Sequence, residues 1–270
     1  MPSIRVRRAD VAPADALLPL LTPGERERLD RAAPADRDVV ASALLLARRT
    51  VAEACGIGAD RVRVRRRCPR CGSTAHGVPV ADRADGGPVP HLSLSRATDL
   101  VVVAVSDAGP VGVDAESTRR AGAGSHPRAD TGRPRADAGP HPRADAGPHP
   151  RADAGPHPRA DEHLARVVLA PGEPPAAGPH GLLRTWARTE AVLKAAGTGL
   201  AVDPRALRVS DGAGRPEVRL VDPAAAAPLA PPPGTRWWLR DLDAGADHVA
   251  ALATLLPVPP DLDDRTTTLA

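Results

Sequence analysis

The first 117 residues carry two hydrophobic periods, one typical of strands and one typical of a helix. Apolar side chains recur with helical spacing between residues 40 and 51, so we predict a long helix from Asp36 to Cys55 that Gly56 ends. Before it, the run from Thr22 to Glu25 has the form of a capping box, with proline at the first helical position. Strands are predicted at 4–7, 61–65, 92–94, 100–105 and 111–116.

Residues 162–256 repeat this mixture of one long helix and several strands. The helix is predicted at 181–196, and strands are predicted at 207–209, 217–221, 236–242 and 248–255. We therefore expect an α/β (mixed α+β) fold of two pseudo-symmetric halves, 1–117 and 162–256, each a small sheet packed on a long helix. The polar residues 257–270 are expected to form a loose tail.

Residues 118–161 differ in kind from both halves. An octapeptide, Ala-Asp-Ala-Gly-Pro-His-Pro-Arg, occurs three times in a row from Ala136 to Arg159. Prolines at this density disfavour helix and central strand, and little is apolar, so we expect a disordered or polyproline-like linker. Its periodic histidines could bind metal or respond to pH, but we favour an expanded surface loop without such a role.

The composition restricts the possible core, ligands and location of the protein but does not identify a function. The chain has no Phe or Tyr and three Trp, so Leu, Val and Ala must fill the core. The net charge of +3 suits a phosphate-rich ligand or an acidic protein partner, and the balanced Arg and Asp of the linker do not indicate a nucleic-acid arm. Three cysteines make no disulfide framework. Neither a signal peptide nor a membrane span is visible, so we expect a cytoplasmic protein without membrane contact.

Two carboxylates near the end of the last predicted strand of the first half are candidates for chemistry. Asp114 and Glu116 are two residues apart, so in a strand their side chains point to one face. Carboxylates placed so closely repel each other unless a cation lies between them, and hard oxygen ligands suit Mg²⁺. The alternative is a solvated edge strand with two surface acids.

The predicted helix of the second half carries a further acid and a cation. Trp186, Glu190 and Lys194 are four residues apart, so they share one helix face. This ridge could face the strand carboxylates, with Glu190 as a ligand or base and Lys194 as a phosphate partner. The alternative is an ordinary surface salt bridge.

In this order, and with Leu92-Ser93-Leu94-Ser95 upstream, the two motifs resemble those of the surfactin-type 4′-phosphopantetheinyl transferases. The resemblance covers roughly residues 20–117 and 162–256. It implies an enzyme that moves the phosphopantetheine arm of coenzyme A onto a serine of an acyl or peptidyl carrier protein, with Mg²⁺ as cofactor. It also implies a monomer whose active site lies in the cleft between the halves.

The resemblance further implies a role for each matching residue. Asp114, Glu116 and Glu190 match the magnesium ligands, and Glu190 also matches the base that deprotonates the carrier serine. Lys194 matches the lysine that neutralises the departing 3′,5′-ADP. The residues that would contact coenzyme A are Arg48, His76, Ser95, Arg96, Asp114 and Lys194.

Three positions depart from the family pattern. Arg96 stands where histidine is usual, Val78 interrupts the Gly-Lys/Arg-Pro turn, and Thr189 replaces the first lysine of the helix motif. One alternative is therefore a weak or inactive relative that acts as a scaffold through its repeat. Another is a metal-dependent hydrolase of a pyrophosphate.

Cys68 and Cys71, with His76, also admit a zinc interpretation. Structural zinc normally takes four ligands, and only Cys55 or His91 could supply the fourth. We favour a reduced surface turn beside the coenzyme A site.

Overall fold

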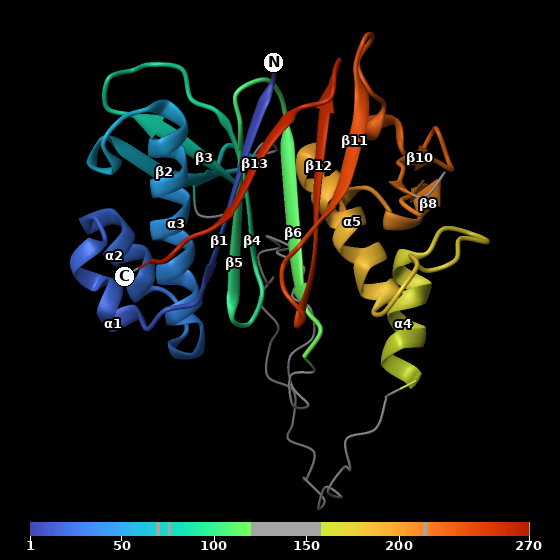
Figure 1. Ribbon diagram of the computed structural model, residues 1–270, viewed down its shortest axis with the longest axis horizontal. Helices are drawn as coiled ribbons and strands as arrows, with labels where there is room; N and C mark the ends of the chain where they lie inside the picture. The colour runs from blue at the N-terminus through green and yellow to red at the C-terminus, as the bar shows by residue number, and fades with distance from the viewer. Residues whose placement is uncertain (69–70, 75–76, 120–157, 213–214, 270) are drawn as a thin grey trace, which may run out of the picture.

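Two β-sheets lie against each other, and one long helix covers the outer face of each (Figure 1). The computed structural model describes residues 1–68, 71–74, 77–119, 158–212 and 215–269. The first sheet has the strand order β13-β1-β5-β4, and the second has the order β11-β12-β6. This confirms the predicted mixed α+β class. The sheets differ in size and order, so the pseudo-symmetry of the halves stays a prediction.

The first half supplies β1 (Ser3–Asp10), α1 (Ala14–Leu17), α2 (Pro23–Asp30), α3 (Arg37–Cys55), β2 (Val62–Arg67), β3 (Val78–Arg83), β4 (His91–Arg96), β5 (Leu100–Ser106) and β6 (Val111–Ser117). The second supplies α4 (Pro158–Val168), α5 (Gly181–Ala195), the short strands β7 (Leu207–Arg208), β8 (Asp211–Gly212), β9 (Arg215–Pro216) and β10 (Arg219–Leu220), and then β11 (Arg236–Leu242), β12 (His248–Leu256) and β13 (Asp261–Thr266).

Local signals explain the helix ends of the first half. Thr22 accepts a hydrogen bond from the Glu25 amide, and the Glu25 carboxylate accepts one from the Thr22 amide, so the predicted capping box is present. Helix α3 ends at Gly56, whose φ of 64° lies in the left-handed region that favours glycine. Both features confirm predictions made from residue order alone.

The core has three layers of apolar side chains. One lies between α3 and the first sheet, one between the two sheets, and one between the second sheet and α5. Strand β5 shows the logic, because Val101, Val103 and Val105 face α3 while Val102 and Ala104 face the second sheet. As the composition predicts, Leu, Val and Ala fill almost all of these positions.

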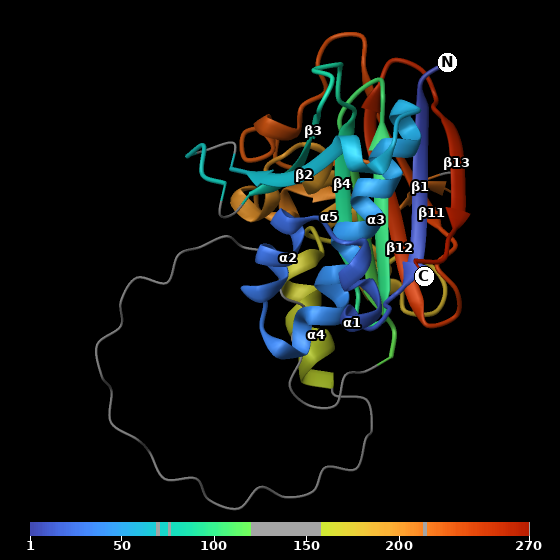
Figure 2. The same cartoon turned by 90° about the vertical axis from the view of Figure 1, so that its left-hand side faces the viewer.

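The last residues of the chain form a strand instead of the predicted loose tail. Strand β13 pairs in parallel with β1 at the edge of the first sheet, as Figure 2 shows. Arg7 of β1 donates a hydrogen bond of 2.7 Å to the Asp263 carboxylate, and Leu269 is buried among the side chains of the first half. The prediction was wrong because this strand carries few apolar residues. Its extended conformation depends on pairing with β1, which lies at the other end of the chain.

Further elements were also not predicted, among them the short helix α1 and the short strands β8 and β9. Strand β3 forms a hairpin with β2, and α4 begins at Pro158, inside the range expected to be a disordered linker. The prediction missed this helix because Pro158 belongs to the proline-rich repeat, which we interpreted as disfavouring helix. Proline is, however, compatible with the first turn of a helix. The expectation for 120–157 lies outside the described residues.

Candidate acidic site between β6 and α5

The structure brings the predicted strand acids and the predicted helix face together. Asp114 and Glu116 project from β6 toward α5, and the Lys194 ammonium lies 2.6 Å from Oδ1 of Asp114. The Trp186 indole N–H donates a hydrogen bond of 2.8 Å to Oε1 of Glu116. Glu190 lies on the same helix, is only 9% exposed, and acts electrostatically on both Glu116 and Lys194. The site therefore joins segments that are about 75 residues apart in the chain.

A glycine allows the helix to lie so close to the strand. A Cβ atom added to Gly112 would come within 1.9 Å of the Ala191 carbonyl oxygen and 2.5 Å of the Ala195 amide nitrogen. Gly112 shares its strand face with Asp114 and Glu116. The close contact of α5 with β6 thus sets the distance between the acids of the strand and the side chains of the helix.

The electrostatics of the site are dominated by like charges in a buried place. Burial and the neighbouring Asp114 carboxylate raise the pKa of Glu116 from 4.5 to about 7, with Glu190 adding to the rise and Trp186 and Lys194 opposing it. Burial works against a charged ammonium, yet Asp114, Glu190 and Glu116 together raise the pKa of Lys194 above its ordinary value. The site therefore has an excess of negative charge that Lys194 only partly offsets.

Asp114 is held on one side only. Its Oδ1 accepts hydrogen bonds from Ser95 Oγ at 2.8 Å and from Lys194 Nζ at 2.6 Å. Its Oδ2 is buried and has no hydrogen-bond partner among the described residues. A buried carboxylate oxygen without a partner is costly, and it is the kind of donor that a hard cation such as Mg²⁺ accepts.

Carboxylate oxygens are ligands that suit Mg²⁺, but among the described residues no three His, Cys, Asp or Glu side chains are arranged so that they could hold a metal ion by themselves. Mg²⁺ commonly takes only one or two carboxylates and completes its shell with water and substrate phosphate. Asp114, Glu116 and Glu190 are the residues that would hold it.

The predicted coenzyme A residue Ser95 has three protein contacts. Its hydroxyl donates to Asp114, accepts the Ala115 amide at 3.2 Å, and lies 3.4 Å from Lys194 Nζ. Only 5% of the residue is exposed. The family resemblance implied a coenzyme A contact for Ser95 but did not predict these partners, which come from β6 and α5.

Arg48 does not join this group of residues. Its guanidinium donates to the Glu25 carboxylate at 2.9 Å, to the Leu20 carbonyl at 2.5 Å and to the Ala59 carbonyl at 3.3 Å. The residue is 6% exposed and sits in the core of the first half. All three guanidinium nitrogens bond to the protein, so Arg48 braces α2 against α3, and its expected contact with a coenzyme A phosphate stays a prediction.

Several arginines act electrostatically on Arg28 of α2, among them Arg96 at the end of β4. Burial lowers the pKa of Arg28, and the positive charges of Arg66, Arg96 and Arg31 lower it further, while Glu25 opposes the change. Arg96 directly follows Ser95 in β4. Sequence reasoning gave Arg96 but missed Arg28, which lies in the capped helix α2 and has no spacing signal. Concentrated positive charge of this kind suits an anionic ligand.

The turn between β2 and β3 carries the cysteine motif. The Cys68 amide donates to the Ser73 carbonyl at 2.8 Å, and the Gly72 amide donates to the Cys68 carbonyl at 2.9 Å. These hydrogen bonds join described residues on either side of positions 69–70, and the surface turn expected beside the coenzyme A site stays a prediction. His76 lies outside the described residues, so its expected contact with coenzyme A and the zinc interpretation both stay predictions.

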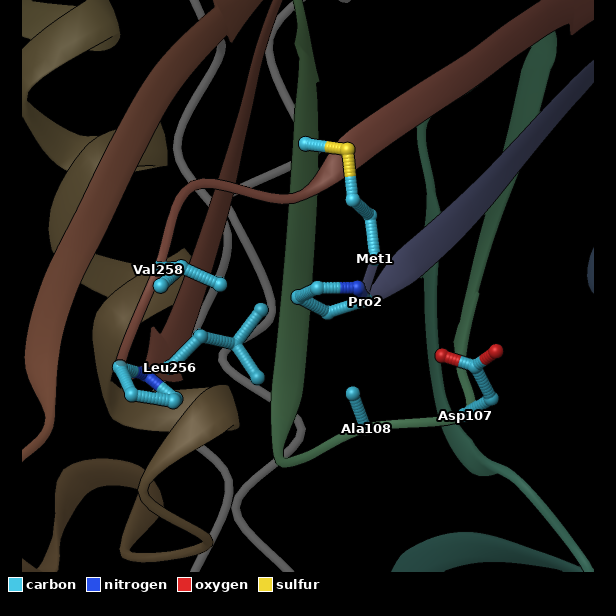
Figure 3. Close-up of a pocket in the computed structure, with 7 residues that line it drawn as sticks. Met1, Pro2, Asp107, Ala108, Leu256 and Val258 are labelled. Carbon is cyan, nitrogen blue, oxygen red and sulfur yellow. The ribbon is translucent and has the colours of Figure 1, made fainter.

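A depression of about 450 Å³ lies at the other end of β6, where the strand begins (Figure 3). It is lined by Met1, Pro2, Asp107, Ala108, Leu256, Pro257 and Val258. None of the predicted site residues belongs to it, and its open, mixed lining gives no reason to place the chemistry there.

The chain matches no family model and no curated protein. Among its described helices, none has the length and apolar character needed to cross a bilayer.

Proposed function

We propose that this protein is a magnesium-dependent 4′-phosphopantetheinyl transferase that modifies a serine of an acyl or peptidyl carrier protein. The observation that supports it most is the meeting of Asp114, Glu116, Glu190 and Lys194 at the β6–α5 contact. Acids this close favour a cation, and so does a buried Asp114 oxygen that has no hydrogen-bond partner within the described part of the chain. The pyrophosphate of coenzyme A would supply further oxygen ligands to that cation.

The reaction requires little covalent work from the protein. The carrier serine oxygen bonds to the phosphorus next to the pantetheine, while the bond from that phosphorus to the bridging oxygen breaks and 3′,5′-ADP departs. The serine proton passes to Glu190, the buried carboxylate on α5, and such general-base catalysis contributes about 10²–10⁴-fold. A bound Mg²⁺ supplies neutralisation of phosphate charge.

Two groups of cations have separate roles in this proposal. Lys194, on the acidic side, offsets the charge that develops on the departing ADP. Arg28, Arg66 and Arg96 would bind another phosphate of coenzyme A, taking the role first expected of Arg48. Both groups have a member next to Ser95, because Arg96 directly follows it in β4 and Lys194 Nζ lies 3.4 Å from its hydroxyl.

The test is transfer of the arm itself. The protein is incubated with coenzyme A, Mg²⁺ and several apo carrier proteins, and intact-mass spectrometry follows the mass gain of each carrier. We expect modification of at least one carrier by the wild type and by Asp15→Ala, which changes an exposed acid in α1. Asp114→Ala and Glu190→Ala should lose at least ~10²-fold of the rate.

The same assay distinguishes the alternatives. Release of 4′-phosphopantetheine without an acceptor would indicate a hydrolase. If no carrier gains mass, and deletion of 118–161 abolishes binding of a carrier, the scaffold interpretation replaces the transferase.

A further inference from the structure

The two sheets meet at a line of contact where serine hydroxyls take the place of backbone hydrogen bonds. Strand β6 pairs with β12 on one edge, and β4 packs along its other edge. Along that edge the Val113 amide donates to Ser93 Oγ at 3.0 Å, and the Ala115 amide donates to Ser95 Oγ at 3.2 Å. The two serines are two residues apart, and so are the two amides, because each strand alternates with the same period.

The two serines are alike in this contact but differ in one respect. Each is about 95% buried, with 4% of Ser93 and 5% of Ser95 exposed, and each accepts one β6 amide. Only Ser95 also donates a hydrogen bond, to Oδ1 of Asp114 at 2.8 Å. Ser95 thereby fixes the carboxylate to the backbone of the strand that carries it.

This fixation leaves the two oxygens of Asp114 in different states. Oδ1 is engaged by Ser95 and Lys194, whereas Oδ2 is buried and has no partner among the described residues. A freely rotating carboxylate would exchange its oxygens, but two donors on one oxygen define which oxygen remains for a ligand. Loss of a partner that orients a metal ligand in this way typically costs about 10- to 100-fold in metal affinity.

We propose that Ser95 is a positioning residue that orients Asp114 so that Oδ2 faces the divalent cation, while Ser93 serves only the contact between the sheets. This inference rests on the proposed function, because it requires that a cation binds at the acids. It differs from the direct coenzyme A contact that the sequence pattern suggests for Ser95.

The test compares Ser95→Ala with Ser93→Ala, which removes an equivalent hydroxyl from the same line of contact. Titration calorimetry measures coenzyme A uptake as a function of Mg²⁺ concentration, and urea unfolding checks that both variants are folded. Ser95→Ala should raise the Mg²⁺ concentration for half-maximal uptake by about 10- to 100-fold. Ser93→Ala should leave it within about threefold of the wild type, and at saturating Mg²⁺ both variants should bind coenzyme A as the wild type does.

Should Ser95→Ala fail to fold, Ser95→Cys keeps the side-chain shape but offers a much weaker donor and acceptor, and it should show the same shift. Equal Mg²⁺ requirements for the Ser95 and Ser93 variants would overturn the positioning role while leaving the transferase proposal intact. Loss of coenzyme A affinity at saturating Mg²⁺ in the Ser95 variant alone would instead assign it a direct substrate contact. A wild type that takes up coenzyme A without any Mg²⁺ dependence would overturn both proposals together.

Discussion

Glu116 carries the clearest electrostatic consequence at the scale of single residues. Its pKa of about 7 means that the folded protein keeps a proton on this carboxyl group at pH values where the unfolded chain has released it. Between pH 4.5 and 7 the folded state therefore binds more protons, and the free energy of unfolding falls as pH rises. Above pH 7 the buried Glu116 carboxylate is ionised, and the free energy of unfolding has fallen by the full amount.

Glu116→Gln should remove this dependence in the metal-free protein. Relative to the wild type, the variant should gain stability with rising pH, by up to about 1.4 kcal/mol per pH unit within that window. Urea unfolding at pH 5 and pH 8 in a chelating buffer measures it. Glu27→Gln, at an exposed position of α2, is the control and should follow the wild type. Parallel curves for wild type and Glu116→Gln would show that Glu116 ionises normally.

Sequence reasoning reached the acids but not their surroundings. Alternation along a strand and four-residue spacing on a helix are local rules, and they correctly grouped Asp114 with Glu116 and Glu190 with Lys194. The partners of Ser95 and Arg48 depend on which strand and helix lie alongside, which no local period records. Arg48 was therefore assigned to a phosphate although its partners are Glu25 and two carbonyl groups.

At the scale of elements, the site depends on how closely α5 approaches β6. Gly112 permits that approach, because any side chain there would overlap the backbone of the helix at Ala191. Backbone atoms cannot rotate away as a flexible side chain can, so the helix as a whole would have to move. The signal was present in the sequence as a glycine inside a strand, which often marks close approach of another backbone.

Gly112→Ala should destabilise the protein by about 1–3 kcal/mol, as overpacking in a core does, and should displace Glu190 and Lys194 from Asp114. Chemical denaturation measures the first effect, and loss of Mg²⁺-dependent coenzyme A uptake the second. Gly24→Ala is the matched control, because an added Cβ there meets no atom within 4 Å inside helix α2. It should be neutral or stabilising by up to about 1 kcal/mol. Equal stability of the two variants would contradict the role of Gly112.

At the scale of the whole molecule, the C-terminal residues of the second half pack against the first half. Strand β13 adds to the sheet beside β1, Arg49 donates to the Leu269 carbonyl at 2.9 Å, and the Leu269 side chain is 2% exposed. Pairing between the first and last strands is the most non-local contact that a chain can make. Hydrophobic periods report only local structure, so they predicted the fold class but could not predict that β13 pairs with β1.

Leu269→Ala should therefore cost about 2–5 kcal/mol, the usual range for a buried leucine. Val258→Ala, in the same C-terminal segment but 45% exposed, should change stability by less than about 0.5 kcal/mol. Thermal and urea unfolding of the two variants provide the comparison. A Leu269 variant as stable as the Val258 variant would mean that packing of the Leu269 side chain contributes little to the stability of the fold.

The most direct measurement of the central claim is calorimetric titration of coenzyme A into the metal-free protein, with and without Mg²⁺. We predict that uptake depends on Mg²⁺ and that Asp114→Ala abolishes this dependence, while Asp15→Ala retains it. Uptake that is equally strong in a chelating buffer, or that survives unchanged in Asp114→Ala, would contradict a cation site formed by the β6 and α5 acids.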